Sequence, residues 1–284
     1  MSTPSFDPVQ YKAGQRQLWD TVAPGWKKWW PTQEQGAQPV SDRLVELAEI
    51  RPGYRVLDVG TGIGEPALTA AQRVGAAGHV VATDQAPQML AIAQERALAL
   101  GVQNVEFREM DAEALDFPDG SFDAILSRFA LMFLPDLATA LARIRRMLRP
   151  NGTFVTVVWD VAPKVPFASL ALGLAQTMFQ LPPPPPGTPS PFGLAEGKLE
   201  AALTQAGFTD VRAEKVPVVF EFQSAEAFTQ YLQDVNPLLA MLANQPTERQ
   251  AEYWQRLVGA VQQYVTAEGS IRVPNTAICG VGQR

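Results

Sequence analysis

The sequence predicts an α/β fold built on a doubly wound, mostly parallel sheet. Three observations favour it: strand-like and helix-like segments alternate between residues 55 and 159, a glycine-rich loop follows the first strand, and 46% of the residues are hydrophobic against 18% charged. Alternation at this spacing requires right-handed crossovers between parallel strands. A chain of 284 residues is long enough to bury such a sheet between helices.

The alternating region supplies five strands and three helices. The strands are expected at residues 55–59, 79–83, 105–108, 122–127 and 153–159, and the helices at 66–74, at 86–100 and after the capping residue Asp136. Beyond it we expect a helix at 198–206, a strand at 211–220, a largely helical stretch at 225–265 and a last strand at 271–281. Ser41 and Asp42 offer an N-cap for a short helix before the first strand.

These elements suggest a single domain, 1–284, with added segments. The cofactor-binding core is expected at 41–160, and the closing strands of the sheet at 196–222 and 269–284. The added segments are an N-terminal arm at 1–40, a proline-rich insertion at 161–195 and a helical cap at 223–268. Seven prolines between positions 182 and 191 exclude helix and central strand there. That run is interpreted as a stiff surface connection, with a polyproline ligand for an aromatic groove as the alternative.

The N-terminal arm is unusually aromatic. Trp19, Trp26, Trp29 and Trp30 fall within twelve positions. Such a cluster must be covered by something, because exposed aromatic patches promote aggregation. Two coverings are considered: permanent packing on the body of the protein, or a lid over the site. We predict the lid, in which residues 11–30 close over the site when ligand binds, with Tyr11, Trp19 and Trp26 as anchors.

Composition excludes several classes of protein. The chain has 23 basic and 29 acidic residues, a net charge of −6, which disfavours nucleic acid and anionic membranes as partners. One cysteine and one histidine (His79) exclude a disulfide framework and a metal site built from these residues. No apolar run reaches the roughly 18 residues of a membrane helix. We therefore expect a cytoplasmic protein, a monomer or homodimer, without an integral membrane segment.

The loop after the first strand is the most informative feature. Gly60, Gly62 and Gly64 remove side chains where the backbone turns and approaches a ligand. Position 65 is Glu, where a dinucleotide fingerprint has Gly or Ala. A carboxylate at a helix N-terminus opposes phosphate binding. The loop therefore favours a cofactor without phosphate and disfavours a nicotinamide oxidoreductase.

Acidic residues also follow the next two strands. Asp84 ends the second strand, 26 residues after Asp58, where a carboxylate can accept both hydroxyls of a ribose. Asp111 follows the third strand, where it could accept from an adenine amino group. Each alone is readily explained as a turn residue. Three acids at the carboxyl edge of successive strands suit a ribose–adenine ligand that carries positive charge.

Residues 40–160 resemble the class I S-adenosylmethionine-dependent methyltransferases, which have a Rossmann-like, seven-stranded sheet. Within them the chain is most similar to the group that contains the ubiquinone and menaquinone C-methyltransferases (methyltransferase type 11). The motifs that carry the resemblance are VLDVGTGIG (56–64), VVATD ending at Asp84, DAEAL (111–115), FPDGSFDAILS (117–127), FALMFLPD (129–136) and LRPNGTF (148–154).

The resemblance implies S-adenosylmethionine as cofactor and assigns residues to it. Around the methionine part it places Asp58, Gly60, Gly62 and Gly64; at the ribose Asp84; at the adenine Gln85, Met89, Asp111 and Ala112; and near the sulfonium Ser127.

The acceptor is left open by these motifs. The implied reaction is in-line displacement of a methyl group onto carbon, oxygen or nitrogen of a small or lipophilic, possibly aromatic, metabolite, for which an enzyme mainly supplies alignment and exclusion of water. No catalytic base is identified. Tyr11, Glu65 and Arg128 are candidates to assist, and Arg128 equally suits a structural salt bridge. The alternative function is a non-catalytic scaffold of the same fold that binds an adenosyl ligand.

Overall fold

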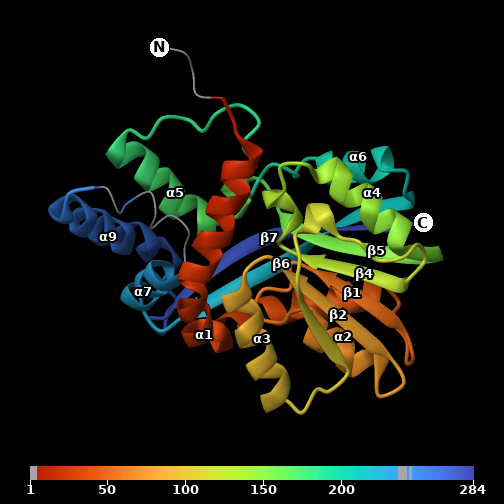
Figure 1. Cartoon of the computed structure of the whole chain (residues 1–284). Helices are drawn as coiled ribbons and strands as arrows, with labels where there is room; N and C mark the ends of the chain where they lie inside the picture. Colours follow the sequence, from red (N-terminus) through yellow and green to blue (C-terminus); the bar gives the residue numbers. More distant parts are fainter. Residues whose placement is uncertain (1–4, 236–241, 243–244) are drawn as a thin grey trace. The chain divides into compact units, whose positions relative to one another are not determined.

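The structure, a computed structural model, describes residues 5–235, 242 and 245–284. The chain divides into two compact units. The sheet unit consists of Pro39–Val161, Pro189–Val216 and Ala277–Arg284, and the helical unit of Met1–Gln38, Ala162–Thr188 and Pro217–Thr276. Figure 1 labels their helices and strands.

The sheet has seven strands in the order β3-β2-β1-β4-β5-β7-β6. These are β1 (Arg55–Val59), β2 (His79–Asp84), β3 (Val105–Glu109), β4 (Phe122–Arg128), β5 (Leu148–Trp159), β6 (Thr209–Phe222) and β7 (Ile271–Gln283). The first five strands pair in parallel, and β7 runs antiparallel to β5, from Thr153 opposite Gln283 to Trp159 opposite Ala277. The predicted fold class is therefore confirmed.

The direction in which the chain adds strands to the sheet reverses at β1. From β1 the chain winds outward through β2 to β3, then returns to place β4 on the other side of β1. In open α/β sheets the crevice for a ligand lies at the carboxyl ends of the strands at this reversal. The loops that follow β1, β2 and β4 are thus the ones that can form a site.

Helices of the sheet unit lie where the apolar spacing predicted them. They are α2 (Ala67–Val74), α3 (Pro87–Ala99), α4 (Leu137–Met147) and α6 (Lys198–Gln205). The Oδ1 atom of Asp136 accepts the backbone N–H of Thr139 at 3.0 Å, which confirms the predicted N-cap of α4.

The N-terminal segment differs from the expectation of an arm followed by a short capped helix. Helix α1 runs from Pro8 to Leu47 as 40 residues, through the prolines in between. Ser41 does not cap a helix, because it lies within the length of α1. Its side chain is fully buried, and its Oγ accepts a hydrogen bond from the Arg128 guanidinium at 2.8 Å. The capping pattern was misleading because the same hydroxyl serves a tertiary contact.

The helical unit contains α5 (Pro166–Phe179), α7 (Ala225–Val235) and α9 (Thr247–Val261) besides the first part of α1. The buried Tyr253 of α9 donates its hydroxyl to the Ala171 carbonyl of α5 at 2.8 Å. Residues 182–191 contain neither helix nor strand, as their prolines predict. Of the predicted helical stretch 225–265, residues 236–241 and 243–244 lie outside the described residues. None of the described helices has the length and hydropathy needed to cross a membrane.

Candidate functional site

The glycine loop joins β1 to α2 at the carboxyl edge of the sheet. The N–H groups of Gly60 and Thr61 both donate to the carbonyl of Thr83 on β2, at 2.8 and 2.9 Å, so the loop is fixed to the neighbouring strand. Gly60 has φ +74°, and a Cβ there would lie 2.4 Å from Ala130 Cβ. Gly62 has φ +55°, but a Cβ built on it meets no atom within 4 Å. The loop is therefore packed at Gly60 and open at Gly62.

Asp58 lies beneath this loop and is completely buried. Its Oδ2 accepts the Ala67 N–H at the start of α2, at 3.1 Å, whereas its Oδ1 has no hydrogen-bond partner. Burial raises the pKa of Asp58 to about 7, although the neighbouring Thr61 hydroxyl and the Arg128 charge both lower it. A buried carboxylate oxygen without a partner is costly unless a cation or donor arrives to meet it.

Asp84 ends β2 and organises the loop opposite. Its Oδ2 accepts the Gly62 N–H at 2.8 Å, and its Oδ1 accepts the Ala86 N–H at 2.9 Å. A carboxylate oxygen has two acceptor positions, so an oxygen that accepts a backbone N–H can also accept a ligand hydroxyl. Asp84 thus holds the glycine loop in place. It also lies at the carboxyl edge of the sheet, where the ribose contact is predicted.

The residues predicted to surround an adenine lie on the two turns that follow β2 and β3. The Met110 N–H donates to the Asp84 carbonyl at 2.9 Å, which brings these turns together. Asp111 caps a short 3₁₀ helix, because its Oδ1 accepts the Glu113 N–H at 2.9 Å. Met89 is buried in the first turn of α3. Gln85 and Ala112 are partly exposed beside them.

Ser127 lies near the end of β4, next to β1. It is fully buried, and its Oγ donates to the Val59 carbonyl at 2.9 Å, immediately before the glycine loop. The hydroxyl therefore connects the two strands that flank the reversal of the sheet. This is a structural contact that sequence reasoning did not anticipate.

Glu65 directly precedes the N-cap of α2, at the helix start that the sequence argument assumed, and its carboxylate is buried and paired. Only 5% of it is exposed; its Oε2 accepts the Thr69 hydroxyl at 2.6 Å, and its Oε1 lies 3.8 Å from Arg96 Nη2. Arg96 comes from α3 and also donates to the Ile63 carbonyl at 2.6 Å. Arg96 lies close enough to offset part of the charge of Glu65. The contacts of Glu65 indicate a structural role.

The other two candidates for assisting catalysis also have structural contacts. Arg128 reaches Ser41 on α1, as described above, and its charge acts on Asp58. Tyr11 belongs to the helical unit, where it packs edge-on against Phe6 with ring centroids 5.5 Å apart. Burial raises the pKa of Tyr11 to about 12, which makes its phenol a poor general base near neutral pH.

One feature of the edge was missed by sequence reasoning: an aromatic pair. The Phe129 ring, one residue beyond β4, stacks on the Trp159 ring at the end of β5, with centroids 4.1 Å apart and planes at 20°. Phe129 has φ +56°, in the left-handed region that bulky residues rarely adopt. The sequence signal was limited to an aromatic residue directly after one strand and another at the end of the adjacent strand.

The arm's tryptophans pack within the helical unit. Trp26 Nε1 donates to the Val235 carbonyl at 3.3 Å and Trp29 Nε1 to Asp234 Oδ2 at 2.6 Å, both on α7. These contacts show what two of the four tryptophans cover. The predicted closure over the site stays a prediction.

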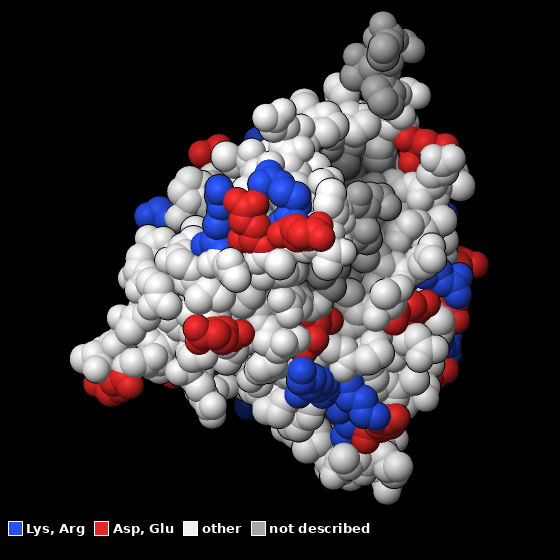
Figure 2. Space-filling view, turned by 90° about the vertical axis from the view of Figure 1, so that its left-hand side faces the viewer, with Lys and Arg blue, Asp and Glu red and all other residues white. Residues whose placement is uncertain are grey.

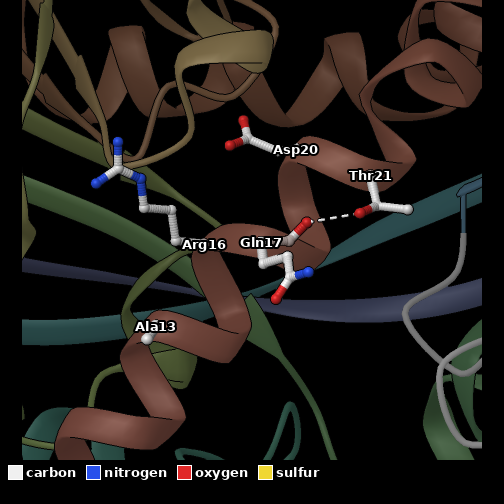
Figure 3. A pocket seen from close by; sticks show the side chains of 5 residues that line it. All are labelled: Ala13, Arg16, Gln17, Asp20 and Thr21. Carbon is white, nitrogen blue, oxygen red and sulfur yellow. Dashed lines mark hydrogen bonds between the residues drawn. The ribbon is translucent and has the colours of Figure 1, made fainter.

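A shallow hollow of about 440 Å³ borders the first part of α1 (Figure 3). Its lining residues all come from α1, and Thr21 Oγ1 donates to the Gln17 carbonyl at 2.8 Å. None of these lining residues was predicted to bind the cofactor. On the face shown in Figure 2, basic and acidic side chains lie beside one another. Pairs of this kind occur on α9, where Glu252 contacts Arg249 at 2.5 Å and Arg256 at 2.6 Å.

Comparison with known proteins defines the family. Residues 56–152, which include the glycine loop, Asp84, Asp111 and Ser127, match the family described as "Methyltransferase domain". Nocamycin O-methyltransferase from Saccharothrix syringae is 34% identical over 206 residues, covering 67% of this chain and 71% of that protein. The chain therefore belongs to the S-adenosylmethionine-dependent methyltransferases.

Two further relatives match over the core alone. Aklanonic acid methyltransferase from Streptomyces sp. (strain C5) is 40% identical over 40% of this chain, and demethylmenaquinone methyltransferase from Thermus thermophilus 42% identical over 44%. The chain spans 52% and 56% of these two relatives, about half their length.

Solved structures confirm the fold. The [4+2]-cyclase SpnF superposes with a TM-score of 0.61 at 20% identity, covering 100% of this chain and 99% of its own. A phosphoethanolamine N-methyltransferase from Haemonchus contortus, solved with S-adenosylhomocysteine, gives a TM-score of 0.54 at 20% identity over 87% of this chain and 52% of its own.

Proposed function

We propose that this protein binds S-adenosylmethionine at the edge formed by β1, β2 and β4 and transfers its methyl group to a small metabolite. The observation that carries the proposal is the buried Asp58 carboxylate together with the open space above Gly62. The Thr61 hydroxyl and the Arg128 charge act on this carboxylate, but its Oδ1 accepts no hydrogen bond of normal geometry. A cofactor with a cationic amino acid end would meet the carboxylate and fill the open space. The proposed binding residues are Asp58, Gly60, Gly62, Gly64, Asp84, Gln85, Met89, Asp111, Ala112 and Ser127.

The proposed arrangement follows the order of the strands. Asp58 and the glycine loop would hold the methionine part, since Asp58 supplies negative charge and Gly62 supplies room. Asp84 would accept the ribose hydroxyls while its contact with the Gly62 N–H keeps the loop in place. Met89 offers an apolar surface and Asp111 an acceptor to an adenine ring.

The cofactor, when bound, supplies an electrophilic methyl group on a sulfonium. The protein's own contribution is positioning: the loop is fixed by the Thr83 carbonyl, and β4 is fixed to β1 by the Ser127 hydroxyl. Rigid neighbours of this kind hold donor and acceptor in line and exclude water. We assign no general base, because Tyr11, Glu65 and Arg128 all have the structural contacts described above.

The acceptor is proposed to be a small molecule. The names of the related enzymes support this, since they refer to aklanonic acid, demethylmenaquinone and nocamycin. The methyl group would go to a carbon, oxygen or nitrogen atom of that molecule.

Calorimetry on matched glycine variants tests the binding site. Gly62→Ala and Gly53→Ala both place a side chain at positive φ (+55° and +85°) with no atom within 4 Å, so their backbone cost is similar. Gly53 lies in the turn before β1, away from the edge. We expect Gly62→Ala to weaken S-adenosylhomocysteine binding at least tenfold and Gly53→Ala to leave it unchanged. Equal affinities would refute the assignment of the loop.

A second measurement separates the enzyme from the alternative, a scaffold of the same fold that binds without turnover. Protein that binds S-adenosylmethionine is incubated with the methyl-labelled cofactor and a panel of phenols, quinols and amines. Transfer of the labelled methyl group to any of these acceptors supports the assignment as an enzyme. Tight binding with no transfer to any acceptor and no S-adenosylhomocysteine formed supports the scaffold. Tighter binding of NAD than of S-adenosylmethionine would contradict both.

A further inference from the structure

The aromatic pair Phe129–Trp159 lies at the carboxyl ends of β4 and β5, beside the proposed cofactor edge. Phe129 follows β4 two residues after the buried Ser127, and Trp159 is the last residue of β5, the next strand of the sheet. Trp159 is 8% exposed, whereas Phe129 is half-buried, so part of the Phe129 surface remains accessible. In this stack the Trp159 ring is buried and the Phe129 ring is partly exposed.

The backbone of Phe129 is held in an unfavourable conformation by its surroundings. Its φ of +56° is left-handed, yet its N–H still donates to the Val157 carbonyl of β5 at 2.9 Å. The following residue, Ala130, fills the space beside Gly60 in the glycine loop. Strain of this kind persists only where neighbouring structure imposes it, and it is concentrated at functional sites. The ring of Phe129 is therefore held against Trp159, and the residue that follows it packs beside the proposed cofactor loop.

We propose that Phe129, supported by Trp159, forms a stacking wall that selects a flat, conjugated acceptor. This inference rests on the proposed function and gives it a substrate class. An aromatic ring presents a quadrupole that favours offset stacking with another flat ring over contact with a puckered one. Trp159 acts as a positioning residue, because its own ring is buried and its effect passes through Phe129.

Binding of two probes of equal skeleton tests the proposal. The probes are 2-naphthol, which is flat and aromatic, and 2-decalol, its saturated analogue; each is titrated into the full-length protein with saturating S-adenosylhomocysteine. We expect wild-type protein to bind 2-naphthol more tightly than 2-decalol. Phe129→Leu should weaken 2-naphthol about tenfold and 2-decalol much less. Trp159→Leu should weaken 2-naphthol by a smaller factor.

Phe208→Leu serves as the matched control. Phe208 stacks on Phe154 in the same unit, with centroids 5.6 Å apart, so its loss removes a comparable contact elsewhere. It should lower the melting temperature without changing probe affinity. A melting curve for each variant verifies folding, and Phe129→Tyr, which keeps the ring, should restore 2-naphthol binding.

Three outcomes would overturn the inference. The first is that Phe129→Leu weakens binding of 2-naphthol and 2-decalol equally, and the second is that it leaves 2-naphthol affinity unchanged. The third comes from titrating the two cofactor forms into the same variant: weaker binding of S-adenosylmethionine with unchanged binding of S-adenosylhomocysteine and of 2-naphthol. The last would mean that the ring faces the sulfonium by a cation–π contact. In each case binding of S-adenosylhomocysteine itself reports on the proposed function separately: if that is absent, the proposed function fails, and if it is retained, only the acceptor wall fails.

Discussion

Cofactor affinity should depend on pH through Asp58. This carboxyl is fully buried, and one oxygen accepts the Ala67 N–H. The other accepts no hydrogen bond of normal geometry, although the Thr61 hydroxyl and the Arg128 charge act on the group. Burial raises its pKa from 3.8 to about 7. A cationic ligand beside the free oxygen would favour the ionised form, so binding and proton release are linked.

The sign and size follow from that pKa. Because the folded-state pKa lies above the unfolded value, the neutral carboxyl stabilises the fold at low pH, and this stability is lost as the pH rises towards and through 7. About three pKa units at ~1.4 kcal/mol each put the cost of ionising Asp58 on the order of 4 kcal/mol above pH 7. The ligand needs the ionised form. Its affinity should therefore fall about tenfold between pH 7.5 and pH 6, where Asp58 is mostly protonated.

Isothermal titration with S-adenosylhomocysteine at pH 6.0, 6.5, 7.0 and 7.5 measures this directly. Asp58→Asn should bind more weakly at pH 7.5 and lose the pH dependence, while its free energy of unfolding at pH 7.5 should rise because an unfavourable buried charge is gone. Asp123→Asn is the control: Asp123 accepts the Arg55 N–H at 2.7 Å near the opposite, amino end of β1. A flat wild-type profile, or the same slope in Asp58→Asn, would refute the reasoning.

Two further predictions concern the loop. Asp84→Ala should weaken S-adenosylhomocysteine binding by roughly 1.5–3 kcal/mol, the scale of hydrogen bonds to a charged group. The fold should be retained because the site lies at a strand end. If calorimetry gives wild-type affinity, Asp84 is a turn residue only. Gly60→Ala should lower the melting temperature more than Gly62→Ala does, because both variants place a side chain at positive φ but only the Cβ at position 60 would meet Ala130 Cβ, at 2.4 Å. Equal melting temperatures for the two variants would show that the loop after β4 yields easily.

The sheet and its glycine loop could be predicted because their signals are local. A buried strand such as β1 is a short apolar run, and the turn after it must contain glycine because the backbone adopts positive φ at Gly60 and Gly62. The N-cap at Asp136 was predictable for the same reason, since its partner, the Thr139 N–H, is three residues away.

Features set by distant partners could not be predicted. Ser41 has the residue type of an N-cap, but its hydroxyl instead accepts a hydrogen bond from Arg128, 87 positions later. Glu65 gives no sequence signal of its pairing with Arg96 on α3. Phe129 adopts left-handed φ although nothing in its residue type favours that conformation, because β5 and the glycine loop together impose it.

If α1 closes over the site, it should do so together with α7. Trp26 and Trp29 on α1 both donate to α7, at Val235 and Asp234, and Lys28 pairs with Asp234 at 2.6 Å. Closure of residues 11–30 alone would break these contacts. We therefore expect S-adenosylhomocysteine to lower amide hydrogen exchange in residues 11–30 and in α7 together, and Trp29→Phe, which removes the 2.6 Å hydrogen bond, to weaken the protection of α7 more than that of α1. Protection of residues 11–30 alone would show that the arm moves independently, and no protection of either segment would show that the arm is permanent packing.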